Sequence, residues 1–216
     1  GIGHEINNPL TFVLGNAQVL QDDFAAAANE KMGAGEKEKI VGEIVDGAER
    51  VAKIVDSLRF FSRVDEPTKV LVDIEQVIER AIQLARGKIR DNAQLVRDFQ
   101  APPPVLADPF RLEQVFVNLL VNAAQASSPL AEPRITVATK HLDGQTLVEV
   151  HDQGVGMPPE TVDHIFDAFY TTKSVGTGTG LGLSIAHKII EESGGSIHVD
   201  SKPGSGSCFT VSLPSV

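Results

Sequence analysis

Apolar residues recur at alternating spacings of three and four along the first part of the chain. The first set is Ile6, Leu10, Val13, Ala17, Leu20 and Phe24. The second set is Val41, Ile44, Ala48, Val51, Val55 and Leu58. Apolar positions that recur in this way are typical of helices that pack in bundles. The pattern therefore predicts two helices that form an antiparallel hairpin, joined by the glycine-containing segment 29–36.

A helical hairpin of this kind cannot bury both of its apolar seams by itself. Two copies that pack into a four-helix bundle would bury them, so we predict a homodimer formed through a hairpin of residues 1–64. The alternative is that the seams pack against the rest of the same chain. The narrow heptad stripe favours the dimer, because helices on the surface of a globular domain usually carry a broader apolar stripe.

The pattern changes after residues 63–69, which include Pro67 and are typical of a linker. Short alternating or apolar segments predict strands at 70–72, 94–99, 105–106, 134–141, 146–150, 196–200 and 207–213. Helical spacing predicts helices at 74–85, 109–126 and 183–193. This arrangement predicts a second domain over residues 70–216, an α+β sandwich with one mixed sheet and its helices on one face.

Composition narrows the classes of function. The 216 residues are 42% hydrophobic, which is enough for a core. The formal net charge of −10, without a local cluster of Lys and Arg, argues against nucleic-acid binding. The single cysteine excludes an intrachain disulfide, and the absence of a long apolar run predicts no membrane segment. The first residues already follow the helical pattern without a preceding cap, so we expect the natural sequence to continue upstream.

Residues 152–184 combine many glycines with large apolar groups. The segments DQGVGMP and GTGTGLGLS flank the aromatic segment IFDAFYTTK. Each glycine in a helix or strand costs about 0.5–1 kcal/mol relative to alanine, so the backbone here is kept free to move or to approach a ligand. A disordered linker rarely carries aromatic groups such as Phe166, Phe169 and Tyr170. We interpret the stretch as a lid over a phosphate-bearing ligand.

Two asparagines, Asn118 and Asn122, lie four residues apart in the predicted helix 109–126 and therefore share one face. Carboxamides beside a glycine-rich lid could hold a hydrated Mg²⁺ and its triphosphate, although this spacing alone is more typical of a solvated face. Asp152 ends an apolar strand just before the lid. A carboxylate there can accept a hydrogen bond from an exocyclic amine such as that of adenine.

Six motifs resemble, in order and spacing, the conserved boxes of sensor histidine kinases. HEINNPL resembles the H box, and the helix with both asparagines resembles the N box. DQGVGMP, IFDAFYTTK, GTGTGLGLS and GSGSCFTVSLP resemble the G1, F, G2 and G3 boxes. The resemblance spans nearly the whole chain. It implies a dimerisation and phosphotransfer hairpin followed by a catalytic ATP-binding domain of the Bergerat, or GHKL, type. No GxxxxGK motif is present, so the chain is not a P-loop protein.

The resemblance implies roles for the H-box residues. His4 would be the phosphoacceptor, and Glu5 would fix its tautomer and take its proton. Asn8, one turn from His4, would position the water of a phosphatase reaction. Pro9 removes a backbone hydrogen bond and loosens the helix there. We expect structural roles for the remaining histidines: His141, His151, His164, His187 and His198.

The resemblance also implies an ATP site. Asn122 would bind Mg²⁺, Asn118 would lie near the phosphates or bind the metal as well, and Asp152 would bind adenine. The other expected contacts are Gly154, Gly156, Phe166, Phe169, Lys173, Gly178, Gly180, Leu181, Gly182 and Thr210. Within that set, Lys173 is expected at the γ-phosphate and Thr210 at the base. Gln125 stands where many family members carry a basic residue, so charge neutralisation would fall on Lys173, Arg111 or the metal.

The function implied is that of an ATP-dependent protein-histidine kinase. It would autophosphorylate His4, pass the phosphoryl group to an aspartate of a response-regulator receiver, and act as the phosphatase of that partner as well. An upstream sensor region and a cytoplasmic location, alone or as part of a membrane-bound sensor, are expected. One alternative is a non-catalytic dimeric scaffold that binds nucleotide. Another is a hydrolysing GHKL ATPase, which is disfavoured because Asn118 stands where those enzymes place a glutamate.

Overall fold

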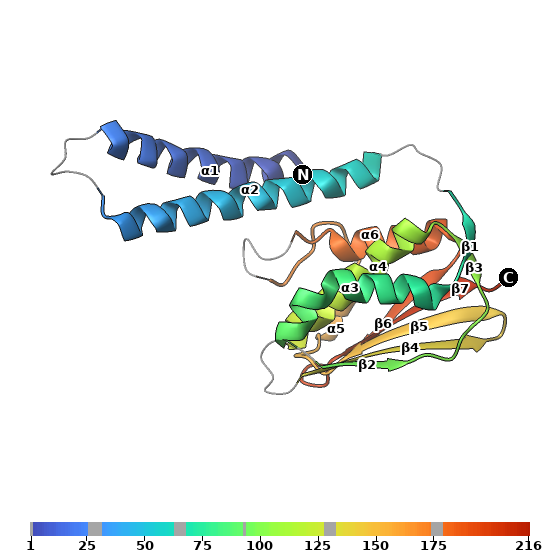
Figure 1. Ribbon diagram of the computed structural model, residues 1–216. Helices are drawn as coiled ribbons and strands as arrows, with labels where there is room; N and C mark the ends of the chain where they lie inside the picture. Colours follow the sequence, from blue (N-terminus) through green and yellow to red (C-terminus); the bar gives the residue numbers. More distant parts are fainter. Residues whose placement is uncertain (1, 26–31, 63–67, 93, 128–132, 174–178) are drawn as a thin grey trace. The chain divides into compact units, whose positions relative to one another are not determined.

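The computed structural model describes residues 2–25, 32–62, 68–92, 94–127, 133–173 and 179–216 (Figure 1). The chain divides into two compact units. One comprises residues 1–63 with 171–179, and the other comprises residues 64–170 with 180–216. Within the part of the chain that the structure describes, each helix is too short or too polar to cross a lipid bilayer.

The first unit contains a hairpin of two long antiparallel helices, α1 (Ile2–Ala25) and α2 (Ala34–Ser62). The seam between them is partly polar. Asn16 Nδ2 donates to Glu43 Oε2 at 3.0 Å, and the Lys37 ammonium lies 2.7 Å from the buried Asp23 carboxylate. Asp23 also accepts a hydrogen bond from the Met32 backbone N–H. This carboxylate therefore connects the end of α1 to the beginning of α2.

The helical hairpin confirms the sequence prediction, but the predicted seams divide between two surfaces. Val13 and Leu20 are half-buried, whereas Leu10 is 40% and Phe24 is 68% exposed. On α2, Val41 is also exposed. Part of each predicted stripe is therefore left exposed in this chain.

Helix α2 approaches α1 most closely at Gly47. A Cβ atom at this position would lie 2.6 Å from Val13 Cγ2 and 3.5 Å from the Pro9 carbonyl oxygen. Valine is stiff about χ1 in a helix, so its methyl group cannot easily move aside. Gly47 thus allows the two helices to pack tightly in the turn that follows the H box.

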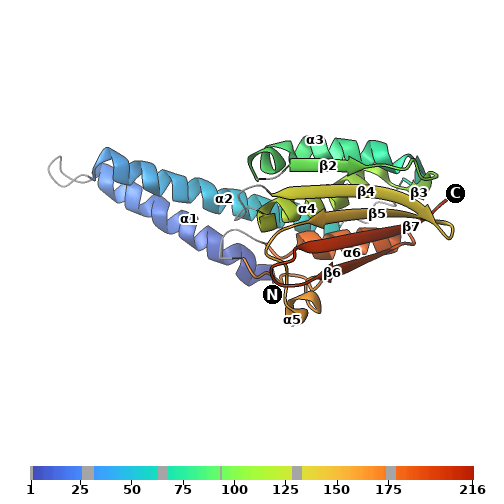
Figure 2. The same cartoon turned by 90° about the horizontal axis from the view of Figure 1, so that it is seen from below.

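In the residues that the structure describes, the second unit contains two sheets and four helices. The elements in chain order are β1 (Val70–Val72), α3 (Ile74–Asn92), β2 (Gln94–Asp98), β3 (Val105–Ala107), α4 (Pro109–Ser127), β4 (Arg134–Leu142), β5 (Gln145–Asp152), α5 (Pro159–Val162), α6 (Gly182–Glu192), β6 (Ser196–Ser201) and β7 (Ser207–Pro214). The main sheet has the order β2-β4-β5-β7-β6, with only β2 and β4 parallel. Helices α3, α4 and α6 cover one of its faces (Figures 1 and 2).

Alternation along the strands creates the core of this unit. Along β5 and β7 every second residue is buried, including Val148, Val150 and Val211. Helix α4 lies against this face with Phe116 and Leu119 fully buried. Its start follows the predicted cap, because Asp108 Oδ1 accepts hydrogen bonds from the next N–H groups of the chain. The sheet and helix layers therefore share one apolar core.

The α+β architecture with helices on one face is confirmed, but the prediction of a single mixed sheet is wrong. β1 and β3 pair with each other in a separate antiparallel sheet. Helix α3 continues seven residues beyond the predicted end at 85, because helical burial continues through Ile89. The short helix α5 was not predicted.

Alanine substitutions at two glycines of α2 test the close approach of the hairpin helices. A Cβ atom at Gly42 would have no neighbour within 4 Å, so Gly42→Ala should stabilise the helix by about 0.5–1 kcal/mol. Gly47→Ala gains the same helix propensity but collides with Val13, which should make it about 1–3 kcal/mol less stable than Gly42→Ala. Urea unfolding of the full chain, followed by circular dichroism at the helix band, compares the two variants. Equal stability of both would contradict the close packing.

Candidate functional site

Asp152 is a buried carboxylate at the end of β5. Its side chain is 2% exposed, and its Oδ1 accepts a hydrogen bond from the Gly154 N–H at 2.8 Å. The backbone N–H of Ser207, directly opposite on β7, also donates to this carboxylate. Burial raises the pKa of Asp152 above its usual value, and the effect outweighs the two backbone donors and His151, which lower it. The carboxylate is therefore a hydrogen-bond acceptor in a fixed position, and burial destabilises its ionised form.

Glycines bring the loops around Asp152 into direct backbone contact. A Cβ at Gly154 would lie 2.5 Å from the Ala126 carbonyl oxygen, and one at Gly156, which has a φ of +66°, would lie 1.9 Å from that of Lys202. Gly206 has a φ of +78° and approaches the carbonyl oxygen of Asp152 itself. The sequence suggested that Gly154 and Gly156 let a ligand approach. In the structure their close neighbours are the protein's own backbone.

Ser207, rather than the predicted Thr210, lies beside Asp152. Buried and half-buried residues alternate along β7, and Ser207 falls on the helix-covered face together with Asp152. Thr210 pairs with Glu149 and belongs to the opposite face of the sheet. The structure therefore does not bring Thr210 to Asp152. The signal that could have identified Ser207 is its even spacing from the buried Phe209 and Val211.

Helices α4 and α6 meet where the two asparagines lie. Asn118 Nδ2 donates to the Gly182 carbonyl oxygen at 3.0 Å, and Asn122 follows one turn later on α4, half-buried like Asn118. Helix α6 begins at Gly182 after the fully buried Leu181, and among the described residues no side chain caps its start. The first N–H groups of an uncapped helix lack intrahelical partners and favour an anion such as phosphate.

The carboxamides of α4 suit Mg²⁺. Asn118 donates through its nitrogen, so its oxygen remains an acceptor, and Asn122 offers a second carboxamide one turn away. Mg²⁺ keeps several waters and needs only one or two protein oxygens. Elsewhere in the described residues, no group of three or more His, Cys, Asp or Glu side chains is arranged to hold a metal ion.

Phe169 and Gly180, which lie on either side of the lid segment, contact each other directly. Phe169 N–H donates to the Gly180 carbonyl oxygen at 2.9 Å, and a Cβ at Gly180 would lie 2.3 Å from the Phe169 carbonyl carbon. The Phe166 ring lies 5.1 Å from the His187 ring of α6. The predicted aromatic anchors are thus packed beside the start of the lid. Lys173 is exposed, and Gly178 lies outside the described residues.

The remaining predicted residues lie elsewhere. His4, Glu5 and Asn8 belong to α1, and their side chains are outside the described part. Arg111 forms an ion pair with Glu192 at the N-terminal end of α4, about 16 Å along the helix from Asn122. Arg111 is therefore not placed to neutralise a phosphate at the asparagines, contrary to one of the sequence expectations.

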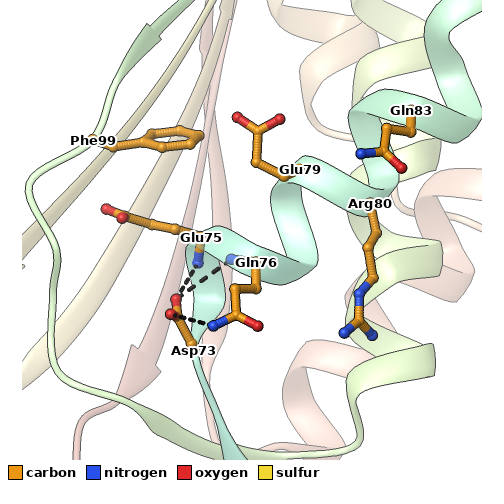
Figure 3. A pocket seen from close by; sticks show the side chains of 7 residues that line it. All are labelled: Asp73, Glu75, Gln76, Glu79, Arg80, Gln83 and Phe99. Atoms are coloured by element: carbon orange, nitrogen blue, oxygen red, sulfur yellow. Dashed lines mark hydrogen bonds between the residues drawn. The ribbon is translucent and has the colours of Figure 1, made fainter.

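A hollow of about 410 Å³ on the outer side of α3 contains none of the predicted site residues (Figure 3). It is lined by Asp73, Glu75, Gln76, Glu79, Arg80, Gln83 and Phe99. Two of its carboxylates already form hydrogen bonds or ion pairs with neighbouring segments of the chain. Glu75 Oε1 accepts from Ala101 N–H and the Thr139 hydroxyl, while Glu79 pairs with Arg97 at 2.6 Å. The region around Asp152 and α6 is therefore the better candidate site.

Comparisons with known proteins found matching family models and relatives. The family model of the "His Kinase A (phospho-acceptor) domain" matches residues 1–67, and that of the "Histidine kinase-, DNA gyrase B-, and HSP90-like ATPase" matches residues 107–216. The chain is 35% identical to sensor histidine kinase ZraS of Klebsiella oxytoca, over 99% of this chain and 45% of that protein. It is 31% identical to sensory histidine kinase/phosphatase NtrB of Azospirillum brasilense, over 99% and 54%. The chain therefore spans about half the length of these curated relatives.

Solved structures show the same likeness. Histidine kinase ThkA, in complex with response regulator protein TrrA, superposes with a TM-score of 0.78 at 26% identity, over 100% of this chain and 60% of that one. Full-length ShkA in complex with AMPPNP has a TM-score of 0.70 at 26% identity, over 98% and 44%.

Substitution of Asp152 should separate stability from binding. The folded-state pKa of Asp152 is raised, so its stabilising contribution is present below the unfolded-state pKa and is lost as the pH rises through the folded-state pKa. At pH 7 to 8, Asp152→Asn should therefore raise the thermal midpoint, and the gain should shrink on acidification. ATP affinity should fall by about 10–100-fold, because a charged acceptor is lost. Thermal unfolding at several pH values measures the midpoint, and calorimetric titration with ATP measures the affinity.

Asp200→Asn on β6 is the matched control for this experiment. It removes the same charge from an exposed position, and we expect it to change neither quantity. A midpoint for Asp152→Asn below that of the unchanged protein at neutral pH, or full ATP affinity, would contradict the role assigned to the buried carboxylate.

Proposed function

This chain belongs to the histidine kinases, and from that premise we propose that it is an ATP-dependent protein-histidine kinase. In the proposed reaction His4 takes the γ-phosphoryl group of ATP and passes it to an aspartate of a response-regulator receiver. The observation that carries the proposal is a buried acceptor, Asp152, in the same unit as the uncapped start of α6. A nucleotide needs both, one for its base and one for its phosphates. We assign residues 1–64 to dimerisation and phosphotransfer and residues 70–216 to nucleotide binding.

The proposed chemistry is phosphoryl transfer to an imidazole. A ring nitrogen of His4 attacks the γ-phosphorus, the bond to the bridging oxygen breaks, and ADP leaves. Glu5 holds the tautomer of the ring and takes its proton. The N–H groups at the start of α6 and the side chain of Lys173 hold the phosphates. Bound Mg²⁺ would neutralise phosphate charge, with Asn122 as its main ligand and Asn118 as the second candidate.

The hydrogen bond of Asn118 favours the kinase over a hydrolysing ATPase. A hydrolase of this fold needs a base one turn before the metal-binding asparagine. A carboxamide cannot take a proton from water, and the Asn118 amide is already engaged with Gly182. The second alternative, a scaffold that binds nucleotide without transfer, differs from the kinase only in the fate of His4. A labelling experiment separates the two.

Two exposed apolar surfaces on the hairpin support the proposed partners. Leu14 and Phe24 are 62% and 68% exposed, and they lie on the side of α1 that continues the heptad seam. We propose that a second copy covers this surface. Phe12 and Val19, seven residues apart, are 60% and 46% exposed on the opposite side of α1. A homodimer leaves this second surface accessible, and we assign it to the receiver.

A phosphatase activity and a cytoplasmic location remain predictions for this chain. One relative, NtrB, is named a kinase/phosphatase. In the proposed reverse reaction Asn8 positions the water that attacks the phosphorylated receiver.

The phosphoacceptor is tested by labelling the full chain with ATP that carries a labelled γ-phosphate. The unchanged protein should gain an acid-labile, base-stable phosphate, because phosphohistidine has that stability, and His4→Gln should reduce the label to background. His141→Gln removes an exposed histidine of β4 and should leave the label intact. Label that survives His4→Gln would sink the proposal. ATP binding without any label on His4 would instead support the scaffold.

The two apolar surfaces of α1 are tested by a crossed pair of substitutions. Leu14→Asp should weaken the dimer at least about 100-fold, because charge would be buried in its interface. Phe12→Asp should leave the dimer intact and slow transfer to the receiver. Analytical ultracentrifugation measures the first effect and loss of label from the phosphorylated chain measures the second. Dissociation by Phe12→Asp, or an intact dimer with Leu14→Asp, would show that the surfaces are wrongly assigned.

A further inference from the structure

The hydroxyl group of Ser201 joins three segments that surround Asp152. Ser201 Oγ accepts a hydrogen bond from Met157 N–H at 2.8 Å, in the loop that follows β5. It lies 2.9 Å from the Gly206 carbonyl oxygen and 3.0 Å from Ser207 Oγ, at the beginning of β7. None of the sequence motifs pointed to this residue, which is half-buried at the end of β6.

These three contacts determine where the proton of each hydroxyl lies. A serine hydroxyl has one proton to donate and two lone pairs to accept with. Gly206 is buried, and the only other hydrogen bond to its carbonyl within the described residues is a long one, 3.4 Å from Lys202 N–H. Ser201 therefore donates its proton to Gly206. Its lone pairs take the Met157 N–H and the Ser207 hydroxyl proton, so Ser207 must be the donor of the pair.

The direction of the Ser207 proton changes what this end of the sheet offers a ligand. Ser207 and Asp152 are directly opposite each other on β7 and β5 and share the helix-covered face. Side chains opposite each other in an antiparallel pair lie about 4.5–5.5 Å apart at Cβ. With its proton given to Ser201, Ser207 has only lone pairs left, and the Asp152 carboxylate is an acceptor as well. The two residues together present acceptors and no donor.

We propose that Ser201 is a positioning residue: by accepting the Ser207 proton, it leaves only hydrogen-bond acceptors for the nucleobase. The site would then select a nucleobase with an amino group over one with a carbonyl group. The inference rests on the proposed nucleotide binding and adds its specificity. Ser201 itself does not contact the nucleotide in this scheme. Without its hydroxyl, Ser207 could rotate its proton toward the ligand and donate it to a carbonyl group.

A merely structural role for Ser201 predicts something else. If its hydroxyl only holds the loops together, its loss lowers the affinity for every nucleotide by the same factor. The ratio of two affinities is therefore the informative quantity. ATP and inosine triphosphate form a suitable pair, because inosine carries a carbonyl group where adenosine carries the amino group.

The test measures the dissociation constants of ATP and inosine triphosphate for the full chain by calorimetric titration. The unchanged protein should prefer ATP by about 100-fold, as sites built around hydrogen bonds discriminate strongly. Ser201→Ala should reduce this preference about ten-fold, and Ser201→Thr, which keeps the hydroxyl, should restore it. In a Ser207→Ala background, Ser201→Ala should not change the ratio further. Ser212→Ala, which removes a hydroxyl of β7 bonded to Gln145 on the other face of the sheet, should leave the ratio unchanged.

Several results would overturn the inference. An unchanged ratio in Ser201→Ala, with both affinities lowered equally, shows a structural role and leaves the proposed function standing. If Ser201→Ala does not fold, Ser207→Ala decides alone, since an unchanged ratio in that variant means that Ser207 does not read the base. Absence of ATP binding by the unchanged protein contradicts the proposed function, and the inference with it.

Discussion

A buried carboxylate needs hydrogen-bond donors, and in the second unit the backbone around Asp152 supplies them. Two backbone N–H groups, from Gly154 and Ser207, point at it. They can do so only because the loop after β5 and the turn before β7 approach each other through glycines, where any side chain would collide with backbone. Burial still keeps its pKa raised, so the unit tolerates a charge that costs stability. Such a cost is typical of a binding site rather than of a core.

The sequence alone indicated the candidate site residues whose choice depends on order along the chain. Asp152 and both asparagines could be identified because each stands at a recognisable position in a strand or helix. The face of the sheet on which Thr210 lies could not be predicted, because it depends on the strand register, which one sequence does not fix. In the structure Ser207 pairs directly with Asp152, and the two side chains lie on the same face of the sheet. Contacts such as that of Arg111 with Glu192 depend on how α4 and α6 pack and have no local signal.

The fold, like the site, was predictable where it depends on local sequence and not where it depends on long-range contacts. Periodicity predicted the hairpin and most strands, but not which strands would form a separate sheet, because pairing is a long-range choice between edges of similar character. The hairpin seam contained polar residues that the apolar pattern could not reveal. Asp23 is buried and Asn16 is half-buried on α1, and both side chains bond to residues of α2. Polar pairs in a helical seam help to fix its register.

The hydrogen bond between Phe169 and Gly180 closes the residues between them into a loop with fixed ends. The entropy of closing a flexible loop rises only slowly with its length, by about 0.6 kcal/mol for each doubling. Insertions or deletions between these two residues would therefore cost the unit little stability, as long as the closing pair is kept. The segment between these two residues can thus change in length and composition during evolution, or accept an inserted reporter peptide, while the residues that flank it keep their contact.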